Sequence, residues 1–250
     1  MLTTQGWVLF PNQVDCRLLE SLRRDLEESY EICKAIRIRN GVSQNADGSA
    51  HHIVVLRESF LEFLARRFLH SEISDFLRTD KYILNSFGGV VNRETFRSYL
   101  HSVHRDIRTF YEAPLMINMI VLLDDFTSDN GATYVLSGSQ AWPDRPSDEI
   151  FFGKADRIIG SAGSIALFDS RLWHSAGANK DGSLRRALTL NFTPPFFKQQ
   201  LYYPEALGLD LQYRLSDDLL QLLGYKSMMP NSLDAWYQPR ERRAYQSDQG

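Results

Sequence analysis

The sequence is poor in cysteine and has little excess charge of either sign. Only Cys16 and Cys33 are present among 250 residues, and both fall in one predicted helix, too far apart along its axis to pair. We therefore expect no disulfide-stapled secreted protein but a chain of the reducing cytoplasm. The 28 Lys and Arg residues against 31 Asp and Glu leave a net charge of −3. Nucleic acid is not expected as a partner, since binding its phosphates requires a basic surface.

Long hydrophobic runs are also missing. The run 115–123 is among the longest, yet it contains Asn118 and falls well short of the roughly 20 residues that span a bilayer. Residues 1–11 carry no Lys or Arg ahead of their short apolar stretch, so we expect neither a membrane span nor a secretory signal. With 43% hydrophobic residues, the composition is that of an ordinary globular protein, with room for two small domains or one large one.

The first 80 or so residues have the apolar spacing of helices. Leucines recur at helical intervals between Val14 and Ile36 and predict one long helix, and further helices are predicted from Ser59 and after Ser71. The residues that could cap the helix starts are Asn12 or Asp15 for the first and Ser59, in an S-x-x-E capping box with Glu62, for the second.

From about residue 82 the pattern changes to short apolar runs separated by turn-forming residues, which predicts a β core of about eight strands over 82–195. A C-terminal helix, Ser216 to Leu223 with Gly224 at its end, and a polar tail occupy about 200–250. Helices on both sides of one β core predict a single domain over 1–250 in which helices cover the sheet. The apolar runs are 82–87, 96–110, 114–123, 132–136, 165–168 and 184–192; candidate lids are the polar segments 38–51 and 142–153.

His104-Arg105-Asp106 is the first pattern with chemical content. In a strand, residues i and i+2 share a face, so His104 and Asp106 would be two ligands of one cation; the alternative is an ordinary histidine–carboxylate pair. His174 completes a set of two histidines and one carboxylate, which suits ferrous iron, with zinc as the competitor. His101 should face the other way, and surface positions are expected for His51, His52 and His70.

Arg185 supports the iron alternative. In the run 184–192 the even positions are mostly large and apolar, whereas the odd ones, from Arg185 to Asn191, are small or polar and should line a cavity. We therefore expect Arg185, and not Arg186, to point inward. A guanidinium inside a cavity needs an anionic partner, and a dicarboxylate offers a bidentate one.

With these elements in this order, the sequence resembles the phytanoyl-CoA dioxygenase-like family of Fe(II)/2-oxoglutarate-dependent oxygenases. The resemblance implies a mainly β fold with flanking helices and a double-stranded β-helix core, the jelly-roll or cupin architecture. The segments that carry it are Gly6-Trp-Val-Leu-Phe-Pro11, His104-x-Asp106, Asn130-Gly-Ala-Thr-Tyr-Val-Leu-Ser-Gly-Ser139, and Gly163 through His174 to Arg185.

The same resemblance implies that His104, Asp106 and His174 bind Fe(II) and that Arg185 pairs with the far carboxylate of 2-oxoglutarate. With O2 as the other cosubstrate, such an enzyme releases succinate and CO2 and hydroxylates, cyclises or desaturates a small metabolite such as an amino acid, a sugar or a biosynthetic intermediate of a natural product. Halogenating relatives lack the carboxylate ligand, so Asp106 argues against halogenation.

One departure from the family concerns the cosubstrate. Several relatives have a hydroxyl residue two positions after the distal histidine, where this chain has Ala176. Two other functions stay open: a cupin-type metal-dependent isomerase or hydrolase without 2-oxoglutarate, and a non-enzymatic β-sandwich binding module. Further site candidates are Thr133 or Asn85 in place of the missing hydroxyl, Asn118 as either a cosubstrate contact or a satisfied buried amide, and Arg108 and Trp173 for the substrate.

Overall fold

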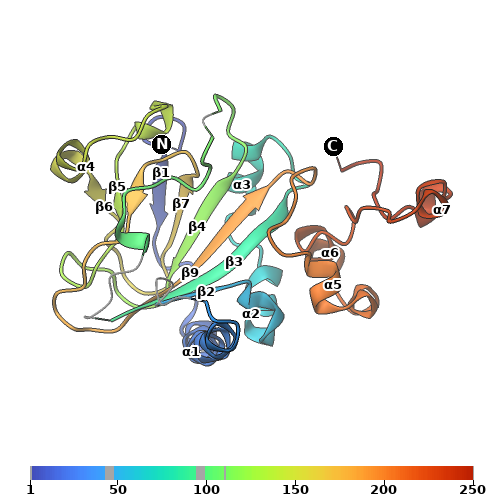
Figure 1. The fold of residues 1–250 in the computed structure, drawn as a ribbon, viewed down its shortest axis with the longest axis horizontal. Coiled ribbons are helices and arrows are strands. Elements are labelled where there is room, and N and C mark those ends of the chain that lie inside the picture. The colour runs from blue at the N-terminus through green and yellow to red at the C-terminus, as the bar shows by residue number, and fades with distance from the viewer. Residues whose placement is uncertain (1, 43–47, 94–98, 110, 250) are drawn as a thin grey trace.

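Two antiparallel sheets and a set of covering helices make up the described part of the chain. The computed structural model describes residues 2–42, 48–93, 99–109 and 111–249. The larger sheet has the strand order β1-β7-β4-β9-β3-β2 and the smaller one β6-β5-β8 (Figure 1). The strands are β1 (Trp7–Phe10), β2 (Ser49–His51), β3 (Ile83–Asn92), β4 (Ile117–Leu122), β5 (Tyr134–Val135), β6 (Asp156–Arg157), β7 (Ile165–Asp169), β8 (His174–Ser175) and β9 (Arg185–Thr193).

Helices come mainly from the two ends of the chain. Figure 1 shows α1 and α2 against one face of the larger sheet, with α5 and α6 beyond its edge. The α-helices are α1 (Cys16–Arg39), α2 (Glu58–Ala65), α3 (His70–Leu77), α4 (Asp148–Lys154), α5 (Tyr203–Leu207), α6 (Asp217–Leu222) and α7 (Leu233–Trp236), and the 3-10 helices are η2 (Ile53–Val55), η3 (Tyr99–His101), η4 (Ser139–Ala141), η5 (Leu209–Tyr213) and η6 (Arg240–Arg242).

The central strands send alternate side chains to two different places. In β4, Ile117, Met119 and Val121 are buried in the same hydrophobic cluster as the leucines of α1. Ile120 and Leu122 belong to a second cluster, which also takes residues from β7 and from the smaller sheet. This alternation follows from the two-residue period of a strand. One face of the larger sheet therefore packs on helices, while the other faces the smaller sheet.

The predicted helices form, with one error at a helix start. Asp15 caps α1 by accepting a hydrogen bond from Leu18 N at 3.0 Å, and Ser216 caps α6 in the same way through Leu219 N. The capping box at Ser59 is wrong. Arg57 is the N-cap residue of α2, and Ser59 lies buried inside the first turn, where its hydroxyl has no hydrogen-bond partner among the described residues.

Two short strands lie in the region expected to be helical. β1 pairs antiparallel with β7, and β2 pairs with β3. Strands of three or four residues have too short a pattern of their own, and the strand that they pair with determines them. The region predicted as a helical cover over about 1–80 therefore also contributes two strands to the larger sheet.

The run 96–110 is not a strand in its described part. It contains η3 and an isolated antiparallel bridge at His104, and Asp106 lies in a bend. Residues 94–98 and 110 lie outside the described residues, as do 43–47 of the first candidate lid. Between residues 82 and 195 the described chain forms seven strands instead of about eight, and the second candidate lid contains α4.

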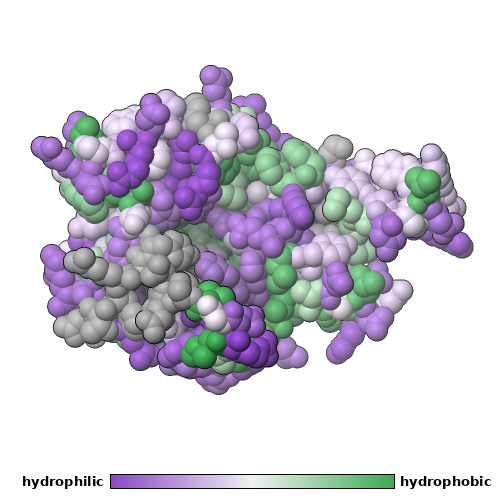
Figure 2. Space-filling view, in the orientation of Figure 1, coloured by the Kyte–Doolittle hydropathy of each residue, from purple (hydrophilic) through white to green (hydrophobic). Residues whose placement is uncertain are grey.

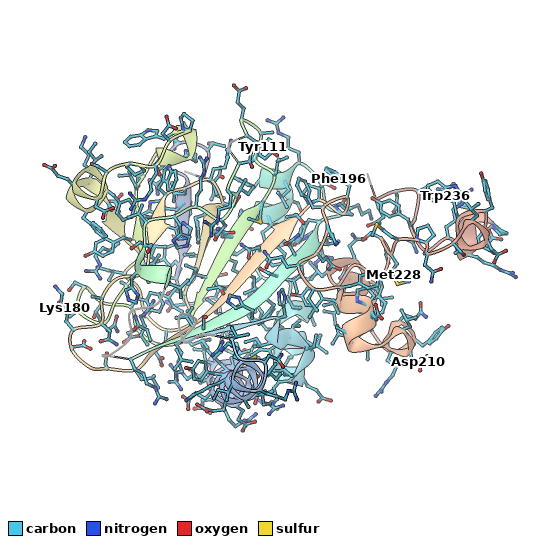
Figure 3. All side chains as sticks on the ribbon, in the orientation of Figure 1. Tyr111, Lys180, Phe196, Asp210, Met228 and Trp236 are labelled. Atoms are coloured by element: carbon cyan, nitrogen blue, oxygen red, sulfur yellow. The ribbon has the colours of Figure 1, made fainter. Side chains whose placement is uncertain are left out.

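The C-terminal segment extends away from the sheets. Trp236, at the far end of this arm, is 60% exposed (Figure 3). Hydrophilic side chains cover most of the face seen in Figure 2. Among the described residues, we find no helix with the length and apolar character needed to cross a membrane.

Candidate active site

His104, Asp106 and His174 come together at one point. Each offers a ligand atom, and these three atoms lie within 4.8 Å of one another. His104 and His174 exchange both backbone hydrogen bonds, at 3.0 and 2.9 Å. Asp106 N donates to Ser170 O at 3.0 Å, and Asp106 Oδ2 lies 3.8 Å from His174 Nε2. The predicted residues thus converge. His104 is placed by an isolated bridge and Asp106 by a bend, whereas the sequence predicted that one face of a strand carries both.

Both imidazoles are held in the same tautomer. Nδ1 of His104 lies 2.7 Å from Ser102 O, and Nδ1 of His174 lies 2.9 Å from Leu172 O. Because a carbonyl oxygen only accepts, each Nδ1 must carry a proton, and Nε2 is the nitrogen of each ring that can bind a metal. Burial, together with the charge of His174, lowers the pKa of His104 to about 4, so that this ring is neutral at pH 7.

This donor set fits a divalent transition metal. Two neutral imidazole nitrogens and one carboxylate oxygen form the facial set of non-haem ferrous sites, which leaves coordination positions open. Zinc accepts the same ligands. The hydrogen bonds to Nδ1 supply the outer support that ligating histidines usually have.

A cavity of about 400 Å³ opens beside the three ligands, and Arg185 is buried in its wall. The Arg185 side chain is 3% exposed, and its guanidinium carbon lies 4.5 Å from the ring centroid of Phe126. Burial, and next the charge of Arg157, lowers the pKa of Arg185 to about 10, so it stays charged at pH 7. Among the described residues, its Nε has no hydrogen-bond partner and no carboxylate lies within 4 Å of the side chain. An anion in the cavity would complete this environment.

Arg186, the next residue, faces the opposite way. It forms ion pairs with Asp124 at 2.7 Å and Glu27 at 2.5 Å, and its hydrogen bonds to Asp124 raise its pKa. The odd positions of β9 after Arg185, namely Ala187, Thr189 and Asn191, also line the cavity. The structure therefore places the two faces of β9 as the sequence pattern predicted.

The two glycine motifs of the resemblance have structural roles. The Asn130 side chain bonds Thr127 N at 2.9 Å and Asp125 O at 2.7 Å, and Gly131 follows with a φ of +89°. Ser139 Oγ accepts a hydrogen bond of 3.0 Å from Trp173 N. The pair Asn130-Gly131 thus builds the turn before Thr133. The pair Gly138-Ser139 anchors Trp173, the residue that precedes His174.

The remaining predicted residues divide between the cavity and its surroundings. Thr133, Asn118, Arg108 and Ala176 all line the cavity. Asn118 donates to Asp106 Oδ2 through Nδ2 and accepts from Asn191 Nδ2 through Oδ1. Both ends of its amide are therefore engaged by the protein.

Two predicted residues do not reach the cavity. Asn85 donates to Lys198 O at 3.0 Å, because an irregularity in the register between Leu84 and Ser86 brings Ser86 to the cavity instead. Trp173 was a candidate for contact with the substrate. It packs in a separate buried cluster, with the guanidinium of Arg105 4.9 Å from its ring centroid.

Sequence reasoning missed His51 and Ser86 as lining residues. His51 was expected at the surface of a helical region, but β2 places it in the cavity wall, where burial lowers its pKa. The strand is three residues long and gives no period by which its pairing with β3 could be found. For Ser86, the signal would have been the irregularity in β3, which alternation alone does not predict.

Comparisons with known proteins agree with this geometry. The model of the family phytanoyl-CoA dioxygenase (PhyH) matches residues 2–187. The uncharacterized protein Rv1501 of Mycobacterium tuberculosis is 36% identical over 68% of this chain and 61% of its own length. Dioxygenase af480 of Aspergillus fumigatus is 28% identical over 61% of this chain and 50% of its own length. The chain thus spans between half and two thirds of these relatives.

A solved structure shows the fold. HygX from Streptomyces hygroscopicus, with nickel and 2-oxoglutarate bound, matches with a TM-score of 0.60 at 14% identity, over 79% of this chain and 86% of that chain. The predicted jelly-roll core with flanking helices is confirmed. Several relatives of this chain, among them af480, are named dioxygenases. As the motifs predicted, and as the match over residues 2–187 shows, the chain belongs to the phytanoyl-CoA dioxygenase family.

Proposed function

We propose that this protein is an Fe(II)- and 2-oxoglutarate-dependent oxygenase of a small metabolite. The observation that carries the proposal is the pairing, in one cavity, of the His104–Asp106–His174 set with a buried arginine that has no acidic partner within 4 Å among the described residues. The two ends of 2-oxoglutarate account for both features of the cavity, because one end can chelate the metal and the far carboxylate can pair with the arginine. The metal and 2-oxoglutarate named for the HygX structure support the same chemistry.

The chain's own residues bind and orient the reactants. His104, Asp106 and His174 would hold the metal through two Nε2 atoms and one carboxylate. We assign the far carboxylate of 2-oxoglutarate to Arg185, with Thr133 supplying the hydroxyl that Ala176 lacks. Asn118 is not assigned to the cosubstrate, because both ends of its amide are engaged.

Bound iron would supply the oxidising power, with one oxygen atom of O2 entering succinate as 2-oxoglutarate loses CO2 and the other entering the hydroxylated product. The role of the protein is to place the substrate bond that is oxidised and to exclude water. Leu100, Met116, Ile120 and Leu190 contribute apolar surface to the cavity for this purpose.

Arg108 is the residue that we assign to the substrate. It lines the cavity, is exposed, and forms no ion pair with an acidic residue in the described part of the chain. An exposed guanidinium at this position would bind a carboxylate or phosphate group that enters from solvent. An amino acid, a sugar acid or an anionic natural-product intermediate would fit such a contact.

The proposed compartment is the reducing cytoplasm. Cys16 and Cys33 both lie in α1 and are free thiols. Free cysteines and a ferrous centre are both maintained in a reducing environment.

Anaerobic spectroscopy tests the proposed function. Fe(II) and 2-oxoglutarate together should produce a weak visible charge-transfer band, and admission of air should then yield succinate. We expect the band to vanish in His174→Ala and Arg185→Gln proteins. Arg186→Gln is the matched control, since it removes a guanidinium one residue away that faces out of the cavity. Wild-type protein with neither band nor succinate would contradict the proposal.

A further inference from the structure

A row of three polar side chains crosses the wall of the cavity next to Asp106. Ser86 of β3 lies directly opposite Asn191 of β9, and Asn191 lies directly opposite Asn118 of β4. Side chains of directly opposed residues in antiparallel strands share one face of the sheet and contact each other. All three line the cavity.

These side chains form a continuous chain of hydrogen bonds that ends on the carboxylate. Ser86 Oγ donates to Asn191 Oδ1, Asn191 Nδ2 donates to Asn118 Oδ1, and Asn118 Nδ2 donates to Asp106 Oδ2. An ionised carboxylate has only acceptors, so Asn118 must present its amide nitrogen to Asp106. Its oxygen then faces Asn191, whose own oxygen faces the Ser86 hydroxyl. The charge of Asp106 thus fixes the orientation of both amides.

Asn118 is an unusual residue for its position. It is 2% exposed, and every other residue of β4 is hydrophobic. A buried amide is costly unless both of its ends are bonded, and a hydrophobic residue would pack in this strand without that requirement. The two hydrogen bonds of Asn118 are therefore what makes the residue compatible with the strand.

Asp106 is in the opposite situation. It lies in a bend, its side chain is 34% exposed, and its backbone N–H donates to Ser170 O. Unlike the two histidines, it has no backbone bridge that sets the direction of its side chain. A carboxylate on such a segment rotates freely unless another group holds it.

We propose that Ser86, Asn191 and Asn118 are positioning residues that hold the Asp106 carboxylate in one orientation for metal binding. The inference rests on the proposed metal site. Asn118 acts by bonding one carboxylate oxygen, and Asn191 and Ser86 act by fixing the Asn118 amide. We call the chain of hydrogen bonds from Ser86 through Asn191 and Asn118 to Asp106 the relay. A carboxylate that is fixed before the metal binds loses less rotational freedom on binding, so the relay raises metal affinity.

Binding of Co(II) tests the relay without any turnover. Affinity is measured by titration of the visible Co(II) absorption and by equilibrium dialysis. We expect Asn191→Leu, which changes no residue in contact with the metal ligands, to weaken Co(II) binding about 10-fold, as outer-sphere substitutions do. Thr189→Val is the matched control: it lies on the same face of β9, its hydroxyl takes no part in the relay, and Co(II) affinity should be unchanged.

A double-mutant cycle separates a relay from a merely structural role. Asn118→Leu should lose about 10- to 100-fold in Co(II) affinity, and adding Asn191→Leu should then have no further effect, because the path is already cut. If Asn118→Leu does not fold, as urea unfolding would show, Ser86→Ala with Asn191→Leu provides the same cycle. Two results would overturn the relay. One is an equal loss of Co(II) affinity when Asn191→Leu is added to the wild type and to the first variant of the cycle, and the other is wild-type Co(II) affinity in the Asn191→Leu protein.

The outcome for the wild-type protein distinguishes the two proposals. If it binds Co(II) and loses it in His174→Ala, but Asn191→Leu has no effect, then the relay fails and the metal site stands. If the wild-type protein binds no Co(II), the metal site fails and the relay fails with it.

Discussion

His104 and His174 exchange both backbone hydrogen bonds across an isolated antiparallel bridge, and their imidazole centroids stand 4.3 Å apart. Each ring also bonds the carbonyl two residues before it through Nδ1. The two histidines are therefore placed by the same local geometry on two segments that run in opposite directions. The backbone itself orients both Nε2 atoms toward one point before any metal arrives.

Removal of either histidine should abolish metal binding. We expect His104→Ala and His174→Ala to lose about 100-fold or more in Co(II) affinity, since loss of a ligand exceeds the cost of outer-sphere changes. Dialysis against Co(II) at neutral pH provides the measurement. His101→Ala is the control, because His101 lies in η3, outside the three-residue cluster, and should bind Co(II) as the wild type does.

Arg185→Leu should stabilise the ligand-free protein. Because burial lowers the pKa of Arg185 to about 10 in the folded chain, folding disfavours its charged form. Because pH 7 lies below the pKa of Arg185 in both the folded and the unfolded chain, the free-energy cost of burying its charge is fully present at this pH. Replacement of a buried, unpaired charge by a hydrophobic residue of similar size raises the free energy of unfolding by about 1–4 kcal/mol. Urea unfolding measures the change.

The same variant should lose its response to the cosubstrate. Adding 2-oxoglutarate with Co(II) should raise the melting temperature of the wild type but not of Arg185→Leu, since only a bound ligand shifts stability. An equal rise in both proteins would place the cosubstrate carboxylate elsewhere.

Thr133→Val should weaken 2-oxoglutarate binding at nearly constant shape. A hydrogen bond to a charged group contributes about 1.5–3 kcal/mol, which corresponds to a roughly 10- to 100-fold higher dissociation constant. Titration of the anaerobic Fe(II) charge-transfer band with 2-oxoglutarate gives this constant. Thr189→Val, another cavity threonine, should keep the wild-type value. Equal dissociation constants of 2-oxoglutarate for the wild type, Thr133→Val and Thr189→Val would contradict the assignment of Thr133.

Gly131→Ala should destabilise the fold strongly. Gly131 has a φ of +89°, and an added Cβ would lie 2.6 Å from the backbone oxygen of Gly177. Strain of this kind costs about 1–3 kcal/mol before the clash is counted. Gly153→Ala is the contrast, because Gly153 lies in α4 and, outside its chain neighbours and the backbone of its own helix, no atom of the described residues lies within 4 Å of the added Cβ. That change should raise the free energy of unfolding by about 0.5–1 kcal/mol, and both effects are read from urea midpoints.

Side-chain periodicity was sufficient to predict the part of the site that lies on regular strands. Arg185 and Asn191 fall on the cavity face of β9 because nine residues of uninterrupted strand keep the two-residue period. The choice of His104, Asp106 and His174 as candidate metal ligands followed from residue chemistry and from the family motifs. His104 and Asp106 were predicted to lie together at the cavity, which they do. The strand predicted to carry them is instead an isolated bridge followed by a bend.

What periodicity could not supply was the contribution of irregular backbone. The hydrogen bonds from Nδ1 to Ser102 O and Leu172 O depend on backbone direction at a bridge, which no side-chain pattern encodes. Ser86 replaced Asn85 at the cavity through a single register shift. β1 and β2 span no more than two periods of a strand pattern, so their pairing partners determine them.

The division of β9 into two faces has a consequence for protein engineering. Leu188 and Phe192 contact the core beneath the helices, whereas Arg185, Thr189 and Asn191 face the cavity. Because the two sets share a backbone but occupy different surroundings, the binding pocket can be redesigned along this strand while the helix-facing residues stay intact. A library restricted to cavity-facing positions, with Arg185 and Asn191 left unchanged, would explore new substrates while sampling few unfolded variants.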